Sequence, residues 1–233
     1  MSLSIDARHC GTVYVIRCSG RIVAGEESGI LEESIKRGLR EFRHIVVDVG
    51  GVSRVDSSGL GLLVRNLAHV RSRAGDLRLA SAPPFLADLL RATKLDTVFK
   101  LCGSEEEAIL SFLKEPAIRG LESSPTGPMV LFVDRSPDLC AFVRALLNSH
   151  GYGVLSTCRS NDAKLLLLST DFDYLVLGPE CSQGPSDEAA DKLKVLANSA
   201  VVAQLSMDFK YDDPERAGSE LLRLLETARA AGM

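Results

Sequence analysis

The sequence lacks the cysteine patterns that mark metal sites and disulfide-bonded domains. It contains six cysteines, and no two of them form a CxxC pair. Their wide spacing predicts neither a zinc site nor a disulfide framework. The cysteines are therefore predicted to be small apolar residues in a reducing cytosol.

Long apolar runs and basic clusters are also missing. No apolar run approaches the roughly 18 residues of a membrane span, and the first ten residues, MSLSIDARHC, lack the pattern of a signal peptide. The formal net charge is −4, with no long basic run. These absences argue against a membrane or nucleic-acid partner. We therefore expect a cytoplasmic protein whose partners are other proteins.

Catalytic signatures are equally scarce. The four histidines are scattered along the chain, and no glycine-rich, lysine-containing phosphate loop or cluster of metal-binding side chains occurs. The sequence therefore predicts that the protein is not an enzyme and uses no cofactor or metal.

The chain is long enough for two domains, since 233 residues with 45% apolar and 25% charged side chains are typical of globular proteins. A stretch rich in proline, glycine and serine follows Lys114. Such a composition is typical of a linker. We predict a first domain at residues 1–115, a linker at 116–128 and a second domain at 129–233.

Strands and helices alternate in both halves, which predicts an α/β fold with mostly parallel sheets. In the first half, strands are expected at residues 12–18, 44–49, 77–82 and 97–102, and helices at 25–42, from 57 onward, at 83–95 and at 104–114. In the second half, strands are expected at 128–134, 152–158, 172–178 and 200–206, and helices at 136–151, 160–170, 186–199 and 213–230.

The segment RVDSSGLGLL, residues 54–63, can be interpreted in two ways. Asp56, Ser57 and Ser58 suit the start of a helix, because their side-chain oxygens can accept from free backbone N–H groups. The expected buried stripe of this helix is Leu60, Leu63, Val64, Leu67 and Val70. Alternatively, one hydroxyl is a phosphorylation site, since a helix N-terminus stabilises a phosphate.

Two glycines in this segment favour the second interpretation. Each of Gly59 and Gly61 costs a helix about 1 kcal/mol relative to alanine. Their presence suggests that another protein's backbone comes close at this place.

The run HIVVDVGGVSRVDSSGLGLLV, residues 44–64, resembles the signature of the STAS domain of anti-sigma-factor antagonists. The resemblance extends from Leu3 to about Lys114 and implies a β-sheet with helices on it. It implies that Ser57 is phosphorylated by an anti-sigma factor with serine kinase activity. It also implies that a serine/threonine phosphatase reverses this modification, and that the partner binds at Asp56, Ser58, Gly59, Leu60 and Gly61.

One departure from the family pattern lies close by. The family often carries an acidic Gly-Glu-(Ile/Leu)-Asp segment after its second strand. Here the segment reads GRIVAGE, so that Arg21 and Val23 stand in the acidic positions.

The second half resembles the receiver domain of two-component signalling, a flavodoxin-like parallel sheet. Receivers hold Mg²⁺ and a phosphoryl group with carboxylates at the strand ends. Here Asp134 is followed by Arg135, and Gly178 stands in place of the phosphoacceptor aspartate. Glu180 lies two residues further on, while Ser206 and Lys210 match the receiver's hydroxyl and lysine. One strand and one helix of the usual pattern are missing, so we expect a degenerate receiver-like domain that binds a partner or forms a homodimer.

Two functions remain open from the sequence. The first is an anti-sigma-factor antagonist, a partner switch that binds the anti-sigma factor when unphosphorylated and is released by phosphorylation of Ser57. The alternative is a constitutive scaffold of STAS and pseudo-receiver domains that works without phosphorylation.

Overall fold

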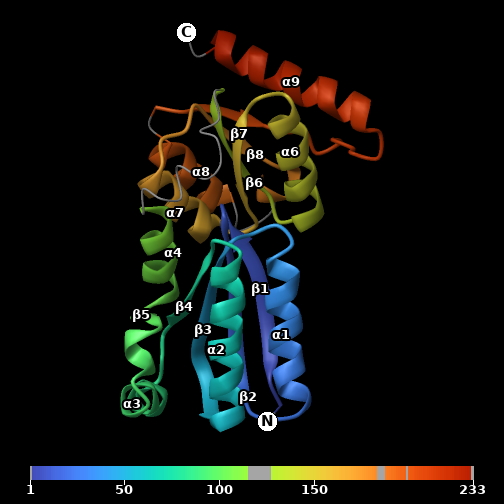
Figure 1. The fold of residues 1–233 in the computed structure, drawn as a ribbon. Coiled ribbons are helices and arrows are strands. Elements are labelled where there is room, and N and C mark those ends of the chain that lie inside the picture. Colours follow the sequence, from blue (N-terminus) through green and yellow to red (C-terminus); the bar gives the residue numbers. More distant parts are fainter. Residues whose placement is uncertain (1, 115–126, 183–186, 198, 232–233) are drawn as a thin grey trace. The chain divides into compact units, whose positions relative to one another are not determined.

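The computed structural model describes residues 2–114, 127–182, 187–197 and 199–231. The chain divides into two compact units, residues 1–112 and 113–233. In Figure 1 each unit consists of a sheet with helices packed on it. The α/β architecture expected from the sequence is therefore confirmed. Residues 116–126 of the predicted linker lie outside the described residues.

The sheet of the first unit is mixed. Its strand order is β5-β4-β3-β2-β1; β1 runs antiparallel to β2, and the other neighbours are parallel. Its strands are β1 (Ser4–Cys10), β2 (Val13–Ile22), β3 (His44–Val55), β4 (Asp76–Ala80) and β5 (Lys100–Cys102). The sequence did not predict β1, because its segment SIDARHC carries little apolar alternation, and one of its seven residues is buried.

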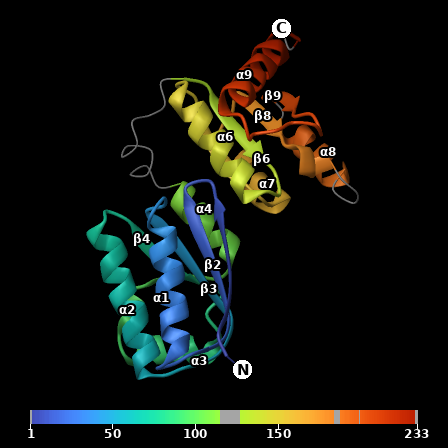
Figure 2. The same cartoon turned by 90° about the vertical axis from the view of Figure 1, so that its right-hand side faces the viewer.

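Helices α1 (Glu26–Gly38) and α2 (Ser57–Ser72) cover one face of this sheet (Figures 1 and 2). Leu31 and Ile35 of α1 share a core with Leu63 of α2 and with Ile45 and Val47 of β3. The continuous apolar run of β3 is buried because helices lie on both of its faces. Helix α3 (Pro84–Ala92), the short η1 (Leu95–Thr97) and α4 (Glu105–Leu113) complete the described part of the unit.

Charged side chains hold α4 to the other face. The guanidinium carbon of the buried Arg78 lies 3.6 Å from the ring centroid of Phe112, close enough for a cation–π interaction. Glu105, in the first turn of α4, forms salt bridges of 2.5 Å with Arg8 and 3.1 Å with Arg17. These contacts fix the last helix of the unit on strands β1, β2 and β4.

The second unit contains a parallel sheet with the order β7-β6-β8-β9. A single core joins these strands to α6 and α9, while α6 and α8 lie on opposite sides of β6 and β8 in Figure 2. The elements are β6 (Met129–Val133), α6 (Pro137–Ser149), β7 (Gly153–Thr157), α7 (Ser160–Ser169), β8 (Tyr174–Leu177), η2 (Pro179–Ser182), α8 (Asp187–Leu196), β9 (Val201–Gln204) and α9 (Pro214–Ala231).

None of the described helices combines the length and the apolar composition that crossing a membrane requires.

Candidate functional site

Ser57 lies on the surface at the first residue of α2. β3 ends at Val55, Asp56 has extended backbone angles, and the helix begins at the next residue. The side chains of Ser57 and Ser58 are exposed. The first-turn N–H groups of a helix carry a partial positive charge. An exposed hydroxyl at this place is accessible to a kinase, and a phosphate on it is electrostatically favoured.

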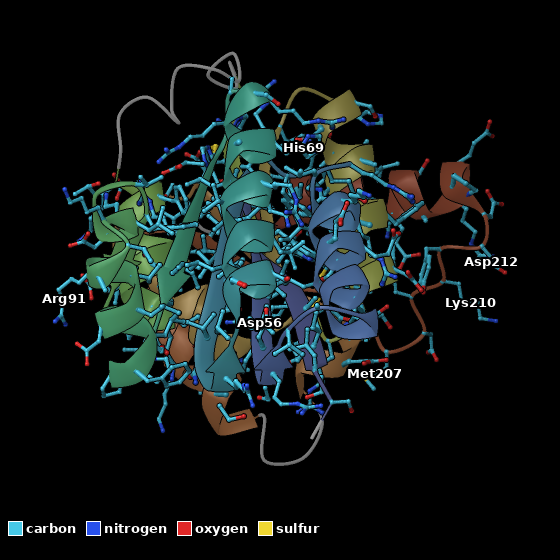
Figure 3. The ribbon with its side chains drawn as sticks, turned by 60° about the horizontal axis from the view of Figure 1, so that its bottom comes forward. Asp56, His69, Arg91, Met207, Lys210 and Asp212 are labelled. Atoms are coloured by element: carbon cyan, nitrogen blue, oxygen red, sulfur yellow. The ribbon has the colours of Figure 1, made fainter. Side chains whose placement is uncertain are left out.

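Asp56 joins the start of α2 to the segment after β2. Its Oδ1 accepts a 2.7 Å hydrogen bond from the N–H of Gly59, and its Oδ2 accepts one of 3.1 Å from the N–H of Ala24. The Asp56 amide in turn donates to the carbonyl of Ile22 at 3.4 Å. The predicted helix cap is therefore confirmed, and the carboxylate and the amide of Asp56 (labelled in Figure 3) also bind Ala24 and Ile22, next to the candidate phosphorylation site.

These hydrogen bonds predict a pH-dependent contribution of Asp56 to stability. The N–H groups of Gly59 and Ala24 lower the pKa of Asp56 below its ordinary value of 3.8. A carboxyl group with a lowered pKa in the folded state stabilises the fold above its unfolded pKa, and this contribution is lost as the pH falls through the folded value. Urea unfolding should therefore show that Asp56→Asn is less stable than the wild type at neutral pH. The difference in unfolding free energy should shrink as the pH falls below 3.8. A difference that does not change with pH would contradict this role.

Gly59 is required by the chain's own packing. A Cβ at this position would lie 2.0 Å from the carbonyl oxygen of Ile22, whereas at Gly61 its only near neighbour is Nη1 of Arg65, at 3.4 Å. Gly59 and Leu60 are buried. The close backbone neighbour of Gly59 is therefore the chain's own Ile22, and Leu60 packs in the core. Gly61, half-buried, remains available at the surface beside Ser58.

The two glycines predict opposite effects of the same substitution. Gly59→Ala is expected to destabilise the protein by about 2–3 kcal/mol, because the new methyl group overlaps a strand carbonyl that has little freedom to move. Gly61→Ala is expected to stabilise it by about 0.5–1 kcal/mol through helix propensity. Urea midpoints of the two variants test this pair, and equal midpoints would contradict the close contact with Ile22.

The buried stripe of α2 differs slightly from the expected one. Leu60, Leu63, Leu67 and Val70 are buried as predicted, whereas Val64 is half-buried. Leu62 and Asn66 are buried in addition. The Asn66 side chain donates a 2.9 Å hydrogen bond to the carbonyl of Leu62, which satisfies part of its polar amide inside the core.

Two arginines lie side by side near Ser57. Arg21 at the end of β2 is paired in register with Arg54 at the end of β3, two residues before Asp56. The charge of Arg54 also contributes to the lowered pKa of Asp56. The departure from the acidic family pattern thus places positive charge at these strand ends, where it favours a phosphate on the neighbouring helix start.

In the second unit, the residues at the positions compared with a receiver, Asp134 and Gly178, do not form an open carboxylate site. Asp134 is fully buried; its Oδ1 accepts from the N–H of Ser136 at 2.8 Å and its Oδ2 from the N–H of Glu180 at 2.9 Å. A Cβ at Gly178 would lie 2.2 Å from that Oδ2. The Asp134 carboxylate therefore occupies the space that a side chain at residue 178 would need. It also accepts hydrogen bonds from the backbone amides of two separate turns.

Glu180, Ser206 and Lys210 do not gather around this carboxylate as a set of acidic and basic side chains. All three residues are exposed, and only the amide of Glu180 contacts Asp134. Lys210 lies on the exposed segment between β9 and α9 (Figure 3).

The first unit is thus a mixed sheet with helices packed on it, and its helix α2 begins with an exposed serine after a capping aspartate. The comparison with known families agrees with this arrangement. Residues 4–108 match the family model of the STAS domain. A curated relative, the anti-sigma F factor antagonist of Paenibacillus polymyxa, is 25% identical over 112 residues, which are 47% of this chain and 94% of the relative. The N-terminal half is therefore a STAS domain.

Solved structures that match part of this chain include an anti-sigma factor antagonist from Mycobacterium paratuberculosis. It is 21% identical, with a TM-score of 0.42, and the match covers 47% of this chain and 93% of that one. A STAS domain protein from Planctomyces limnophilus is 24% identical, also with a TM-score of 0.42, over 46% of this chain and 96% of its own.

Proposed function

We propose that this protein is an anti-sigma-factor antagonist that works as a partner switch. Its unphosphorylated form binds an anti-sigma factor with serine kinase activity. Phosphorylation of Ser57 releases the complex, and a serine/threonine phosphatase restores the binding form. The observation that supports this proposal most strongly is the exposed Ser57 at the start of α2, directly after Asp56, within a STAS domain.

The local electrostatics support a switch at this position. A phosphoserine carries a charge of about −1.5 to −2 at neutral pH. The N-terminal amides of α2 and the arginines at the ends of β2 and β3 favour this charge. A partner surface that fits the neutral serine beside the Asp56 carboxylate would meet a second, larger negative charge after phosphorylation. The modification therefore changes binding without requiring the STAS fold to change.

The partner-binding surface is proposed to comprise Asp56, Ser57, Ser58 and Gly61. Gly59 and Leu60 support this surface from inside, because both are buried. We propose that the protein itself performs no catalysis, since the switch needs only an acceptor serine and a docking surface.

We further propose that the second unit is a degenerate receiver domain that binds a partner or a second copy of the chain. In chain order its strands are arranged 2-1-3-4, which is the flavodoxin-like order without the fifth strand. Gly178 and the buried, backbone-bound Asp134 support a unit that takes no phosphoryl group of its own.

The proposal is tested by titrating the purified, unphosphorylated chain into a kinase-type anti-sigma factor from the same organism, alone and bound to its sigma factor. We expect a stable complex and displacement of the sigma factor. Absence of binding by the unphosphorylated form would reject the antagonist function. A complex that persists after complete phosphorylation would favour the constitutive scaffold.

A further inference from the structure

Three of the six cysteines lie near the carboxyl ends of the strands in the second unit. Cys140 lies in the first turns of α6, Cys158 directly follows β7, and Cys181 lies in η2. The Sγ atoms of Cys140 and Cys158 are 3.8 Å apart. The two residues are separated by 18 positions in the sequence, so the fold alone brings their thiols together.

The two thiols differ in their access to solvent. Cys158 is half-buried and lines a surface pocket of about 330 Å³ together with Arg135, Arg159 and Cys181. Cys140 is fully buried. A small reagent that enters the pocket therefore reaches Cys158 first, and Cys140 lies within contact distance behind it.

The surroundings also shift the pKa values of the two thiols in opposite directions. The hydrogen bond with Cys140 lowers the pKa of the Cys158 thiol, and the charge of Arg159 lowers it further. Burial and the carboxylates of Asp134 and Asp162 raise this pKa, but the net shift is downward. The same hydrogen bond, together with burial, raises the pKa of Cys140. Reactivity with peroxides follows thiolate character and exposure, so both factors select Cys158.

We propose that Cys158 is a peroxide-reactive thiol and Cys140 its resolving partner, so that the second unit carries a reversible disulfide site. The Cys158 thiolate attacks hydrogen peroxide; an S–O bond forms, the O–O bond breaks, and the departing hydroxide takes up a proton to become water. Cys158 is then a sulfenic acid. The Cys140 sulfur attacks it; the S–S bond forms, the S–O bond breaks, and the hydroxide leaves as water with the Cys140 proton. Peroxide is reduced, and the two thiols are oxidised to one disulfide.

The bond requires only a local movement. The sulfur atoms must approach from 3.8 Å to the disulfide distance of about 2.05 Å. The product joins the start of α6 to the residue that follows β7. The backbone carbonyls of Asp134 and Thr157 lie 3.4 and 3.7 Å from the Cys140 sulfur. A thiol reductant would reverse it by exchange. This inference rests on the second unit alone and does not depend on the role of Ser57.

The full-length chain tests the proposal directly. The reduced protein is treated with hydrogen peroxide, its remaining thiols are alkylated, and its peptides are mapped by mass spectrometry without reduction. We expect the Cys140 and Cys158 peptides to appear linked, and the link to disappear after dithiothreitol. Before oxidation, Cys158 should be alkylated roughly tenfold faster than Cys140. Cys18, buried in the first unit, should stay reduced in the same digest and serves as an internal control.

Three single variants assign the roles of the thiols. Cys181→Ser should keep the link, because Cys181 only borders the pocket. Cys140→Ser should abolish it and leave Cys158 as a sulfenic or sulfinic acid, whereas Cys158→Ser should leave Cys140 reduced. Full alkylation of both thiols in peroxide-treated wild type would overturn the proposal. A Cys158–Cys181 link in place of the expected one would overturn the assignment of Cys140.

Discussion

Ser57→Asp is expected to weaken binding to the anti-sigma factor by roughly tenfold to a hundredfold, which corresponds to about 1.4–2.8 kcal/mol of binding free energy. The substitution places a second carboxylate next to Asp56 on the exposed start of α2. A docked partner then has to desolvate two adjacent negative charges in place of one. Isothermal titration calorimetry of the two purified proteins measures the change.

Ser72→Asp is the matched control for this charge. Ser72 is exposed on the last turn of the same helix, and Figure 3 shows the two ends of α2 well separated, with Asp56 at one and His69 near the other. The control should leave the affinity within about twofold of the wild type, because exposed charges further apart than a Debye length are largely screened. Equal losses in both variants would indicate a non-specific charge effect and contradict a binding surface at Ser57.

Gly178→Asp is expected to destabilise the protein by about 3–5 kcal/mol, although it introduces the residue type that the proposed resemblance to receivers would place here. The new Cβ would lie 2.2 Å from Oδ2 and 2.5 Å from Cβ of Asp134. The new carboxylate would also face that of Asp134 in a buried place. Urea unfolding of the full-length protein measures the loss, through the transition of the second unit.

A double variant shows whether Asp134 is the cause. Asp134→Gly removes the clashing side chain, but it also leaves the N–H groups of Ser136 and Glu180 without their acceptor. The variant Asp134→Gly/Gly178→Asp should therefore lose less stability than the sum of the two single variants, because the clash is absent. Strictly additive losses would contradict the packing of Asp134 against Gly178.

The strand and helix pattern could be predicted wherever the apolar periodicity was strong. The buried runs of β3, β6 and β8 and the amphipathic α2 and α6 lie close to where the sequence places them, but β3 continues to Val55, beyond the predicted residues 44–49. β1 was missed, because a strand with one buried residue shows no such periodicity. β5, predicted at residues 97–102, is limited to Lys100–Cys102, because residues 95–97 form a 3-10 turn instead.

The local chemistry of the site was predictable in part. The cap by Asp56 follows from residue type and spacing, since Asp at this position accepts from the third amide of the helix. The second bond of Asp56, to the amide of Ala24, and the contact of Gly59 with Ile22 join residues more than 30 positions apart. Such contacts depend on the pairing of β2 with β3, and no local pattern reveals them. The approach of Cys140 to Cys158, 18 positions apart in the second unit, was missed because it depends on the packing of α6 beside β7.

The most direct measurement of the partner switch is the site and number of phosphates on the full-length protein after incubation with ATP and the kinase-type anti-sigma factor. We predict one phosphate, on Ser57, with no modification of Ser57→Ala and normal modification of Ser58→Ala. Intact-mass and peptide mass spectrometry give both quantities. Phosphorylation of Ser57→Ala to the same extent as the wild type would contradict the assignment of Ser57 as the switch.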